Sequence, residues 1–495
     1  MGTLKLSLSI AIMFSAQPSF EPTAWSHVRS TFQQIWGYED FRPPQGEVIR
    51  ALLAHQDAIV LMPTGGGKSI CFQLPALLRT GLTLVVSPLV ALMENQVQDL
   101  RDRRLPAALL HSEQSSYQRR QTLMAIEKQQ LRLLYLSPET LFSEPVWQRL
   151  CLPHVQINGL ILDEAHCLVH WGDSFRPAYR RLGAVRPALL KSKPPGSRMA
   201  IAAFTATADP QTQQQIRAAL KLNSPQTICV SPYRSNLHLS VNRISTPRAR
   251  RQQLLKQIKN SRETGLVYVR SRRESEQLAD WLSEQGFRTA AYHAGLTGGE
   301  RRSIESAWLS GTLPFVICTS AFGMGVNKPD VRWIVHFHAP ALLWEYMQEI
   351  GRAGRDGKPA HALTLMSSWL DPEDRQRQRF WRDRLQLQQQ KARSIAKQLP
   401  LAGNLSEAIR PLQARSIRAD DVATTLALLH RSGSLEWQDP FNYQLLSTAI
   451  DSPTAAIDLS AFANSKQCRW RFLLSAFGFA QDSQWRCGHC DRCTS

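Results

Sequence analysis

The stretch Met62-Pro-Thr-Gly-Gly-Gly-Lys68-Ser69 decides the fold of this chain. It follows the apolar run 58–62, a predicted strand, and precedes a helical pattern, which is the context that a phosphate-binding loop requires. Lys68 would place positive charge on the β- and γ-phosphates, and Ser69 would offer its hydroxyl to Mg²⁺. The backbone that would cradle the phosphates is that of Thr64, Gly65, Gly66 and Gly67. A glycine-rich turn with a chance lysine is the alternative, and the preceding strand disfavours it.

Short apolar runs alternate with amphipathic stretches along most of the chain. The first series is 58–62, 82–87, 132–137, 159–163 and 200–204. The second begins near residue 237 and includes 265–269, 314–318 and 333–337. Short apolar strands separated by helical patterns indicate parallel βαβ units. We therefore expect an α/β protein with two parallel-sheet lobes, at 25–236 and 237–366.

Two adjacent carboxylates follow one of these strands, in Ile161-Leu-Asp163-Glu164-Ala-His166. An Asp at the end of a parallel strand lies beside the phosphate loop in an α/β sheet. Asp163 would hold Mg²⁺, and Glu164 would orient or deprotonate the attacking water. Alone, the tetrapeptide could be an acidic surface turn, but its place after the phosphate loop and a strand favours an ATP-hydrolysing centre.

Two arginines lie between glycines in the second lobe, in the segment 348–357. Hydrolysis needs positive charge on the γ-phosphate in the transition state, and an arginine from another lobe supplies it only when the lobes close. Arg355 and Arg352 are the candidates. A surface turn would explain this segment by itself, and the two motifs of the first lobe make that reading weaker.

Composition points to a polyanionic partner. Lys and Arg number 59 against 40 Asp and Glu, a formal net charge of +19, which suits nucleic acid or an acidic membrane surface. No apolar run reaches the length of a membrane-spanning helix, so we expect no membrane partner. Residues 1–24 are expected to be a disordered leader, or the true start is Met13; a weak signal peptide over 1–16 is the alternative.

These motifs, in this order, resemble the RecQ family of superfamily 2 helicases. Met62 replaces the first glycine of the full phosphate-loop pattern, as is common in that superfamily. The segment 36–45 resembles the family's adenine-recognition motif, which implies that Gln45 reads the adenine edge while Tyr38 and Arg42 help to hold the nucleotide. The resemblance covers roughly 30–366 and 466–493, and it implies two RecA-like lobes with the P-loop NTPase fold.

The resemblance also implies contacts with a DNA strand. The segments 86–96 and 137–139 match strand-contacting motifs of lobe 1, and 204–208 matches the motif that joins hydrolysis to movement. In lobe 2, 292–296 and 321–329 match the RecQ pattern closely. Candidate contacts here are Ser87, Asn327 and Lys328.

The most family-specific segment is 167–179, which in RecQ proteins senses single-stranded DNA. Trp171 and Phe175 would stack on bases, and Arg176 could add a cation–π or phosphate contact. The alternative is that both aromatics are core residues. This chain has Asp173-Ser174 where the family usually has His-Asp. This departure from the family pattern concerns the strength of signalling from bound DNA to the ATP site.

Four cysteines near the C-terminus have the spacing of a metal site: Cys468, Cys487, Cys490 and Cys493. Four thiolates close a tetrahedral shell around structural Zn²⁺. His489 is a rival fourth ligand and disulfides are a further alternative. We expect a zinc-binding module at 466–495, as RecQ relatives have.

Between lobe 2 and the cysteines, residues 367–465 read as a helical and winged-helix-like region. Asp371-Pro372 begins an Arg- and Gln-rich helix, which either faces nucleic acid or is merely solvated. In 405–451, a helix near 420–431 is followed by Gly433 and two alternating strands, as a recognition helix leads into a wing. The region would then bind duplex DNA, with Arg415, Arg418 and Arg431 facing phosphates. The alternative is a spacer that packs only on lobe 2.

The sequence thus predicts an enzyme, an ATP-dependent DNA helicase with ATP, Mg²⁺ and Zn²⁺ as cofactors. By resemblance it moves 3′ to 5′ on single-stranded DNA and unwinds forked duplex DNA, in repair or recombination, in the cytoplasm or nucleoid. An RNA-dependent ATPase or RNA helicase is the first alternative, since no sequence feature reads the 2′-OH. A non-catalytic nucleic-acid scaffold is the second, and the intact motif residues disfavour it.

Overall fold

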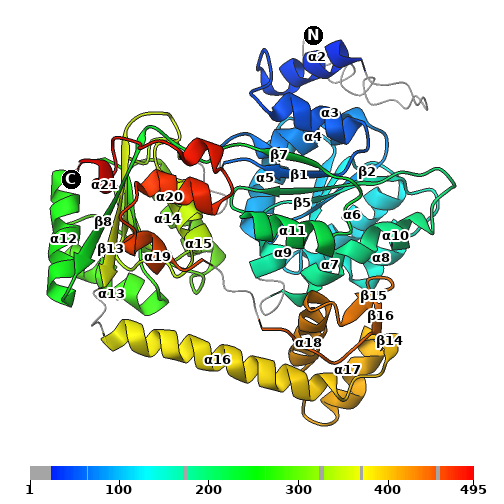
Figure 1. Ribbon diagram of the computed structural model, residues 1–495. Helices are drawn as coiled ribbons and strands as arrows, with labels where there is room; N and C mark the ends of the chain where they lie inside the picture. Colours follow the sequence, from blue (N-terminus) through cyan, green and yellow to red (C-terminus); the bar gives the residue numbers. More distant parts are fainter. Residues whose placement is uncertain are drawn as a thin grey trace.

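The structure is a computed structural model that describes residues 24–63, 65–170, 176–261, 263–322, 328–367, 372–452 and 457–494. Two lobes stand side by side, and a small domain lies below lobe 1 (Figure 1). Five of the expectations stated above fall outside the described residues: the leader 1–23, Thr64, Trp171, Phe175 and Asn327.

Lobe 1 is built on a parallel sheet of seven strands in the order β3-β4-β2-β5-β6-β1-β7. The strands are β1 (Ala58–Leu61), β2 (Leu82–Val86), β3 (Ala107–Leu110), β4 (Leu133–Leu136), β5 (Ile157–Leu162), β6 (Ala200–Thr205) and β7 (Gln226–Cys229). The helices are α2 (Trp25–Trp36), α3 (Gln45–Leu53), α4 (Lys68–Leu78), α5 (Val90–Asp102), α6 (Ser116–Glu127), α7 (Pro138–Leu141), α8 (Glu144–Leu150), α9 (His166–His170), α10 (Val185–Leu190) and α11 (Pro210–Ala219), with the 3-10 helix η1 (Pro177–Ala184).

Lobe 2 repeats this architecture with a parallel sheet of six strands in the order β10-β11-β9-β12-β13-β8. The strands are β8 (Leu237–Ile244), β9 (Gly265–Tyr268), β10 (Ala291–Tyr292), β11 (Phe315–Cys318), β12 (Trp333–His336) and β13 (Ala360–Ser367). The helices are α12 (Pro247–Asn260), α13 (Arg272–Glu284), α14 (Gly298–Leu309) and α15 (Leu343–Ile350).

Each sheet is buried on both faces, which explains why its strands read as continuous apolar runs. In β1, Ile59 and Leu61 enter one core while Ala58 and Val60 enter the core on the other face. The eight runs named above form β1, β2, β4, β5, β6, β9, β11 and β12, so the two-lobed parallel-sheet prediction is confirmed. Strands β3, β7, β10 and β13 were not predicted: β3 and β10 are short, and β7 and β13 carry polar residues.

The small domain has a winged-helix arrangement. It comprises the long helix α16 (Pro372–Ala396), then β14 (Ala402–Asn404), α17 (Leu405–Gln413), α18 (Ala419–Arg431), β15 (Leu435–Trp437) and β16 (Asn442–Leu445). The strands form an antiparallel sheet in the order β14-β16-β15. Ile395 of α16 shares one core with Leu426 of α18 and Trp437 of β15. The expected helix, glycine, strand, turn and strand are therefore present, with Gly433 at φ 69° after α18.

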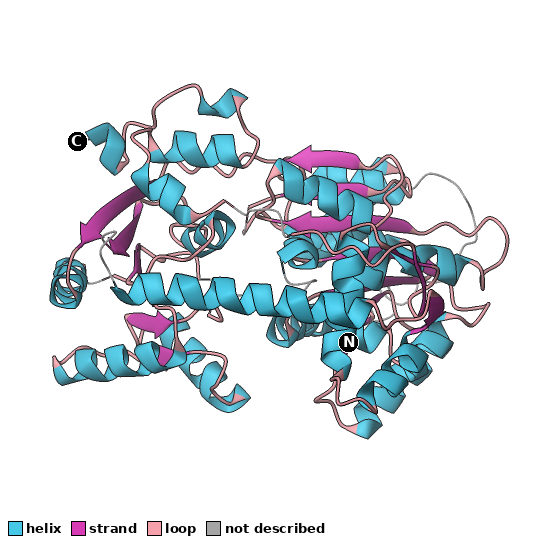
Figure 2. Cartoon of the chain, turned by 60° about the horizontal axis from the view of Figure 1, so that its bottom comes forward, coloured by secondary structure: helices cyan, strands magenta, loops and turns pink. Residues whose placement is uncertain are grey.

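This domain rests on lobe 1, although α16 leaves from lobe 2. Arg181 of η1 donates a hydrogen bond to the Pro440 carbonyl at 3.1 Å, and Lys221 pairs with Glu436 at 2.8 Å. Phe441 lies edge-on against Trp147, with ring centroids 5.4 Å apart. Figure 2 shows α16 passing in front of both lobes to reach the domain. A spacer that packs only on lobe 2 is therefore the wrong description.

Helix α18, the expected recognition-type helix, packs on protein along much of its surface. Helix α18 packs against η1 of lobe 1 and against α16 of its own domain. From Asp421 to Arg431 all its residues are buried or half-buried. Arg431 donates to the Asp451 carbonyl at 2.6 Å, and Arg418 pairs with Asp420 at 3.1 Å, so their first partners are protein groups.

The C-terminal segment is fused to lobe 2. Its elements are α19 (Leu459–Asn464), α20 (Arg469–Ala476), the 3-10 helix η2 (Gln481–Ser483) and α21 (Asp491–Thr494). Trp470 donates its indole N–H to the Leu237 carbonyl of β8 at 3.1 Å, and Leu459 and Phe462 join the lobe 2 core. Residues 457–465 therefore belong with lobe 2, whereas we expected the helical region to extend to 465. Among the helices that the structure describes, none combines the length and apolarity needed to cross a membrane.

We predict that Phe441→Ala loosens the small domain from lobe 1 without unfolding either. Each lost edge-to-face contact is worth about 0.5–1.5 kcal/mol beyond the buried area. Hydrogen exchange should therefore speed up in η1 and α18. Leu446→Ala is the matched control, because Leu446 lies in the same domain but is 61% exposed. Equal exchange rates in the two variants would contradict the packing role of Phe441.

Candidate active site

The loop from Met62 to Lys68 connects β1 to α4 at the carboxyl edge of the lobe 1 sheet. Met62 donates its backbone N–H to the Thr205 carbonyl at 3.0 Å, so the loop starts next to the end of β6. Gly67 adopts φ 76°, and a Cβ there would collide with the Gln45 side chain. Glycine adopts this left-handed conformation without strain, and α4 begins directly after it at Lys68.

The two carboxylates of the site follow β5, two strands from β1 in the sheet. Asp163 is 4% exposed, and its carboxylate accepts hydrogen bonds from the Glu164 backbone N–H at 3.0 Å and from Gln96 Nε2 at 3.2 Å. Glu164 faces the phosphate loop, with Oε1 3.5 Å from Lys68 Nζ. The structure thus brings Lys68 together with Asp163 and Glu164, which lie almost a hundred residues later in the sequence.

The protonation of the two carboxylates differs because their surroundings differ. Burial raises the pKa of Asp163 to about 6, and the neighbouring Glu164 carboxylate adds to the effect. Burial would also raise the pKa of Glu164, but the Lys68 ammonium and His166 hold it below its usual range. Glu164 is therefore ionised at neutral pH, as a group that orients or accepts a proton from water must be.

Lobe 2 supplies two arginines to this site. A Cβ placed on Gly65 would lie 3.6 Å from Arg355 Cδ, so the Arg355 side chain crosses to the phosphate loop of lobe 1. Arg355 is held by a hydrogen bond from Nε to the Gly351 carbonyl at 3.3 Å. Burial, with repulsion from Arg352 and Arg234, lowers the pKa of Arg355 to about 10, so it is charged at neutral pH. Arg352 is buried and acts on the Glu164 carboxylate.

Of the residues expected at the adenine end, Gln45 contacts the loop, and the three differ in exposure. Gln45 is buried: its Oε1 accepts from the Arg42 backbone N–H at 3.0 Å, and its Nε2 donates to the Gly66 carbonyl at 3.2 Å. Tyr38 is 51% exposed, with its ring 5.9 Å from that of Phe32. Arg42 is also exposed. The first turn of α4 carries Ser69.

Several residues that were not predicted from the sequence also contact the site. Gln96 holds Asp163, and Thr205 bonds to His166 Nδ1 at 3.0 Å through its hydroxyl. Thr207 donates its backbone N–H to the same hydroxyl at 3.1 Å. All three lie inside segments that were recognised as motifs in the sequence. Their partners could not be predicted, because they depend on how the strands pair.

The candidate DNA contacts that the structure describes do not form one cluster. Ser87 is 1% exposed at the end of β2. Arg176 pairs with Glu139 at 3.2 Å, which joins the segments 167–179 and 137–139 as neighbours. Lys328 is buried, and its ammonium donates to the Leu309 carbonyl at 3.0 Å and lies 3.4 Å from Asp330.

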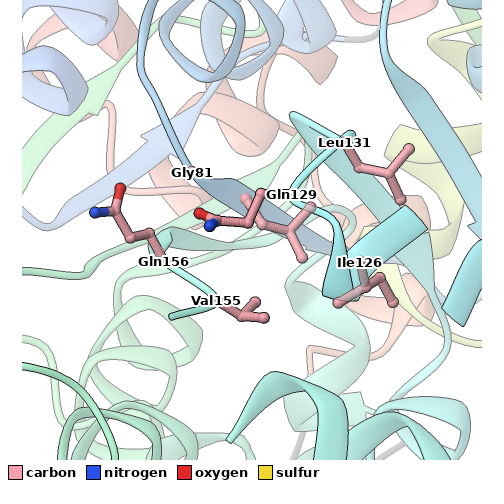
Figure 3. A pocket seen from close by; sticks show the side chains of 7 residues that line it. Gly81, Ile126, Gln129, Leu131, Val155 and Gln156 are labelled. Carbon is pink, nitrogen blue, oxygen red and sulfur yellow. The ribbon is translucent and has the colours of Figure 1, made fainter. Parts of the chain in front are cut away.

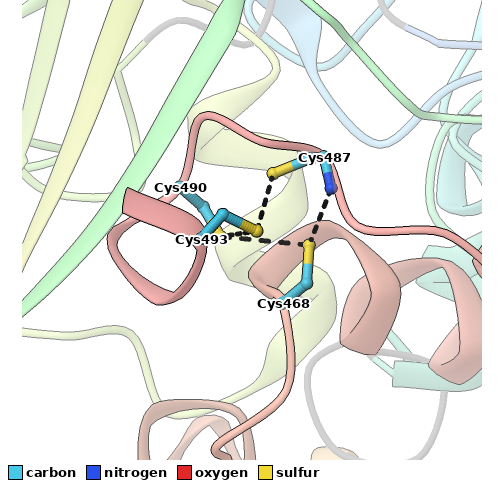
Figure 4. Close-up of side chains that lie close together, drawn as sticks. All are labelled: Cys468, Cys487, Cys490 and Cys493. Carbon is cyan, nitrogen blue, oxygen red and sulfur yellow. Dashed lines mark hydrogen bonds between the residues drawn. The ribbon is translucent and has the colours of Figure 1, made fainter. Parts of the chain in front are cut away.

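The four C-terminal cysteines converge (Figure 4), and their sulfur atoms all lie within 4.8 Å of one another. Cys490 Sγ is 3.6 Å from that of Cys493 and 3.9 Å from that of Cys468. Sulfurs in a tetrahedral site with Zn–S bonds of about 2.3 Å lie about 3.8 Å apart. The arrangement is compatible with a zinc ion. His489 is not part of this cluster: its Nε2 lies 3.3 Å from the Tyr233 hydroxyl, and Cys468 is the fourth member.

A hollow in lobe 1 lies away from these groups (Figure 3). It is bordered by Gly81, Leu82, Leu131 and Gln156, at the amino ends of strands β2, β4 and β5. The carboxylates and the phosphate loop follow the carboxyl ends of the strands. None of the residues that line the hollow is charged, so it offers no group for hydrolysis.

Comparison with known proteins agrees with this geometry. Residues 42–216 match the DEAD/DEAH box helicase family, and residues 249–357 match the helicase conserved C-terminal domain. The chain is 50% identical to the ATP-dependent DNA helicase RecQ of Synechocystis sp., covering 94% of this chain and 98% of that one. It is 38% identical to the probable ATP-dependent DNA helicase RecS of Bacillus subtilis, covering 68% of this chain and 66% of the relative.

Solved structures share the fold at low identity. The helicase MrfA bound to DNA has a TM-score of 0.57 and 19% identity, covering 69% of this chain and 50% of that one. The Dbp5 protein of S. cerevisiae bound to RNA has a TM-score of 0.55 and 15% identity, covering 69% of this chain and 87% of that one. One neighbour holds DNA and the other RNA, so this likeness shows the two-lobed architecture alone.

We predict that Arg355→Ala binds ATP nearly as well as the parent but hydrolyses it about 10³–10⁵ times more slowly, the usual worth of an arginine finger. Steady-state ATPase rates and the binding of a fluorescent ATP analogue would measure the two effects. Arg288→Ala, an exposed arginine of the same lobe, is the control. Full turnover in Arg355→Ala would show that the lobe 2 arginine takes no part in hydrolysis.

Proposed function

The chain belongs to the RecQ family of ATP-dependent DNA helicases, and we propose that it uses ATP hydrolysis between its lobes to move along single-stranded DNA and unwind duplexes. The observation that carries this proposal is that Arg355 of lobe 2 lies against Gly65 in the phosphate loop of lobe 1. Nucleotide bound there would contact both lobes. Its hydrolysis can therefore change how they sit, which is what a strand-moving ATPase requires.

The residues around the loop suit a nucleotide triphosphate and Mg²⁺. Lys68 Nζ is buried, and within the described ranges it has no hydrogen-bond acceptor, only the Glu164 carboxylate at 3.5 Å. A phosphate oxygen would satisfy it. Asp163 offers a buried carboxylate, and Ser69, in the helix that follows the loop, offers a hydroxyl. Oxygen donors of this kind suit a hard cation. Bound Mg²⁺ would neutralise charge on the β- and γ-phosphates.

In this proposal each side chain has a separate role in hydrolysis. Lys68 binds the phosphates, Asp163 and Ser69 hold the cation, and Glu164 orients the attacking water and accepts its proton. Arg355, with Arg352 beside it, stabilises negative charge on the γ-phosphate. Gln45, with Tyr38 and Arg42, would hold the base, with the Gln45 amide exchanging its loop contacts for the adenine edge.

DNA is the favoured polymer because a relative named as a DNA helicase aligns over nearly the whole chain. The net charge of +19 suits a phosphate backbone. We propose that the strand crosses the lobes near Ser87, Arg176 and the segment 171–175. Repair or recombination would follow from such a substrate, as would action in the cytoplasm or nucleoid of a prokaryote. RNA is the weaker alternative.

We also propose that the four cysteines hold one structural Zn²⁺. Two backbone N–H groups point at the sulfurs: Arg469 N is 3.3 Å from Cys490 Sγ, and Cys487 N is 3.3 Å from Cys468 Sγ. Such hydrogen bonds stabilise thiolates, the form that binds metal. A closed shell of four thiolates would leave no position for substrate, so the role would be to hold α20 and α21 against β8.

We predict one tightly bound zinc per chain in freshly purified protein, measured by elemental analysis. Structural sites of this kind bind with an apparent energy of about 10–16 kcal/mol that becomes folding energy. Cys490→Ser should therefore yield protein that is insoluble or sensitive to protease in 457–494. Cys229→Ser is the control, because Cys229 is an exposed cysteine outside the cluster. Protein that is folded and free of metal would overturn the zinc assignment.

The proposed function is tested by ATPase rates with single-stranded DNA, with single-stranded RNA and with no polymer. We expect DNA to stimulate hydrolysis most, and the same protein to displace one strand of a forked duplex when ATP is present. Glu164→Gln should bind ATP and fail in both assays, since it keeps the shape of the side chain and loses its charge. Stimulation by RNA but not by DNA would exchange the proposal for its alternative.

A further inference from the structure

An aromatic contact joins the two lobes beside the carboxylates of the ATP site. Trp344 of α15 in lobe 2 stacks on His170 at the end of α9 in lobe 1, with ring centroids 4.6 Å apart and planes 10° from parallel. The same indole lies 5.4 Å from the His166 ring. One side chain of lobe 2 therefore contacts two rings of the helix that follows Glu164.

His166 connects this contact to the proposed water-activating carboxylate. Its Nδ1 lies 3.3 Å from Glu164 Oε2 and 3.0 Å from the Thr205 hydroxyl. The Glu164 carboxylate in turn lies 3.5 Å from Lys68 Nζ. Trp344 is thus separated from Glu164 by a single side chain, and the orientation of the His166 ring decides which oxygen Glu164 presents to the phosphate loop.

The helix that carries Trp344 also positions the lobe 2 arginines. Helix α15 ends at Ile350, and Arg352 and Arg355 follow immediately. Arg355 reaches Gly65 in the arrangement in which Trp344 reaches His166. A lobe movement that withdraws the arginines would therefore withdraw the indole as well, because Trp344 lies on α15 and the arginines lie in the turn that follows it.

The contact depends on ring faces rather than on charge. Burial, together with the neighbouring His166, lowers the pKa of His170 to about 3, so this ring is neutral at physiological pH. The Trp344 Nε1 atom is buried and has no hydrogen-bond partner among the described residues. Stacked neutral rings fix the relative orientation of the two planes, which is the property needed to hold a third ring in place.

Given the proposed ATPase function, we propose that Trp344 is a positioning residue for hydrolysis. With the lobes closed, its indole holds His166 against Glu164 and Thr205, so that the carboxylate takes its working orientation only when Arg352 and Arg355 are at the phosphate loop. ATP would then be bound in open and closed states, but hydrolysed only in the closed one.

The test is DNA-stimulated ATPase of Trp344→Ala, with kcat and the KM for ATP measured separately. Misplacing one group of an active site by about 1 Å can cost on the order of 100-fold in rate. We therefore expect kcat to fall by roughly 10- to 100-fold, with KM changed by less than about threefold. Trp344→Phe, which retains a ring, should recover most of kcat, whereas Trp344→Leu, which keeps bulk without a ring, should not.

Two further measurements separate positioning from mere packing. The double variant Trp344→Ala with His170→Ala should be no slower than Trp344→Ala alone, because both changes remove one contact. Trp281→Ala, on the outer helix α13 of lobe 2 and over Arg251, should behave as the parent does. If Trp344→Ala does not fold, Trp344→Leu against Trp344→Phe gives the same comparison.

The outcome distinguishes this inference from the function on which it rests. A parent protein with no DNA-stimulated ATPase would overturn the proposed function. The positioning role alone would be overturned if the parent had that activity and Trp344→Ala had the same kcat as the parent. It would also be overturned if Trp344→Leu recovered as much of kcat as Trp344→Phe.

Discussion

The charge balance around the phosphate loop is the constraint on which the rest of the structure depends. Lys68, Arg352 and Arg355 meet the carboxylates of Asp163 and Glu164 in a space that is largely closed to solvent. Burial is the main cause of the lowered pKa of Arg355, and repulsion from the neighbouring Arg352 and Arg234 adds to it. A bound polyphosphate would relieve that repulsion. Because the cations come from different lobes, relief favours closed lobes, and loss of the γ-phosphate favours separation.

The small domain alters what such a movement can do. Helix α16 leaves lobe 2, whereas the domain at its far end rests on lobe 1 through Arg181, Glu436 and Phe441. The domain therefore bridges the two lobes on the side away from the N-terminal helices (Figure 1). Its contact surface includes η1, which begins directly after Arg176, the neighbour of Glu139. Helix α18 of this domain therefore packs on η1, directly after Arg176.

Local patterns predicted much of this molecule. Most of the strands, the phosphate loop, the Asp163-Glu164 pair and the cysteine spacing follow from signals within a few residues. So do α18, Gly433 and the strands β15 and β16, whereas β14 and α17 were not predicted. The packing of those elements was not predictable from the same signals. Apolar positions such as Val422 and Leu426 show that α18 has a buried face. They do not show that the other positions of α18 contact η1. The sequence of a helix that protein covers on two sides resembles that of an amphipathic helix with a few extra neutral residues.

By itself the sequence determined the chemistry: a lysine after three glycines, adjacent carboxylates after a strand, and four thiols at metal-binding spacing. These depend on backbone geometry over short stretches, which residue identity controls directly. Only the tertiary structure decided which side chains meet. His170 lies in the segment 167–179, but nothing in that segment indicates Trp344 as its partner, and the two residues stand far apart in the chain and come from different lobes. The end of Lys328 is directed to a carbonyl instead of outward. Such contacts depend on how sheets, helices and lobes pack, a balance of many weak interactions that no short stretch of sequence contains.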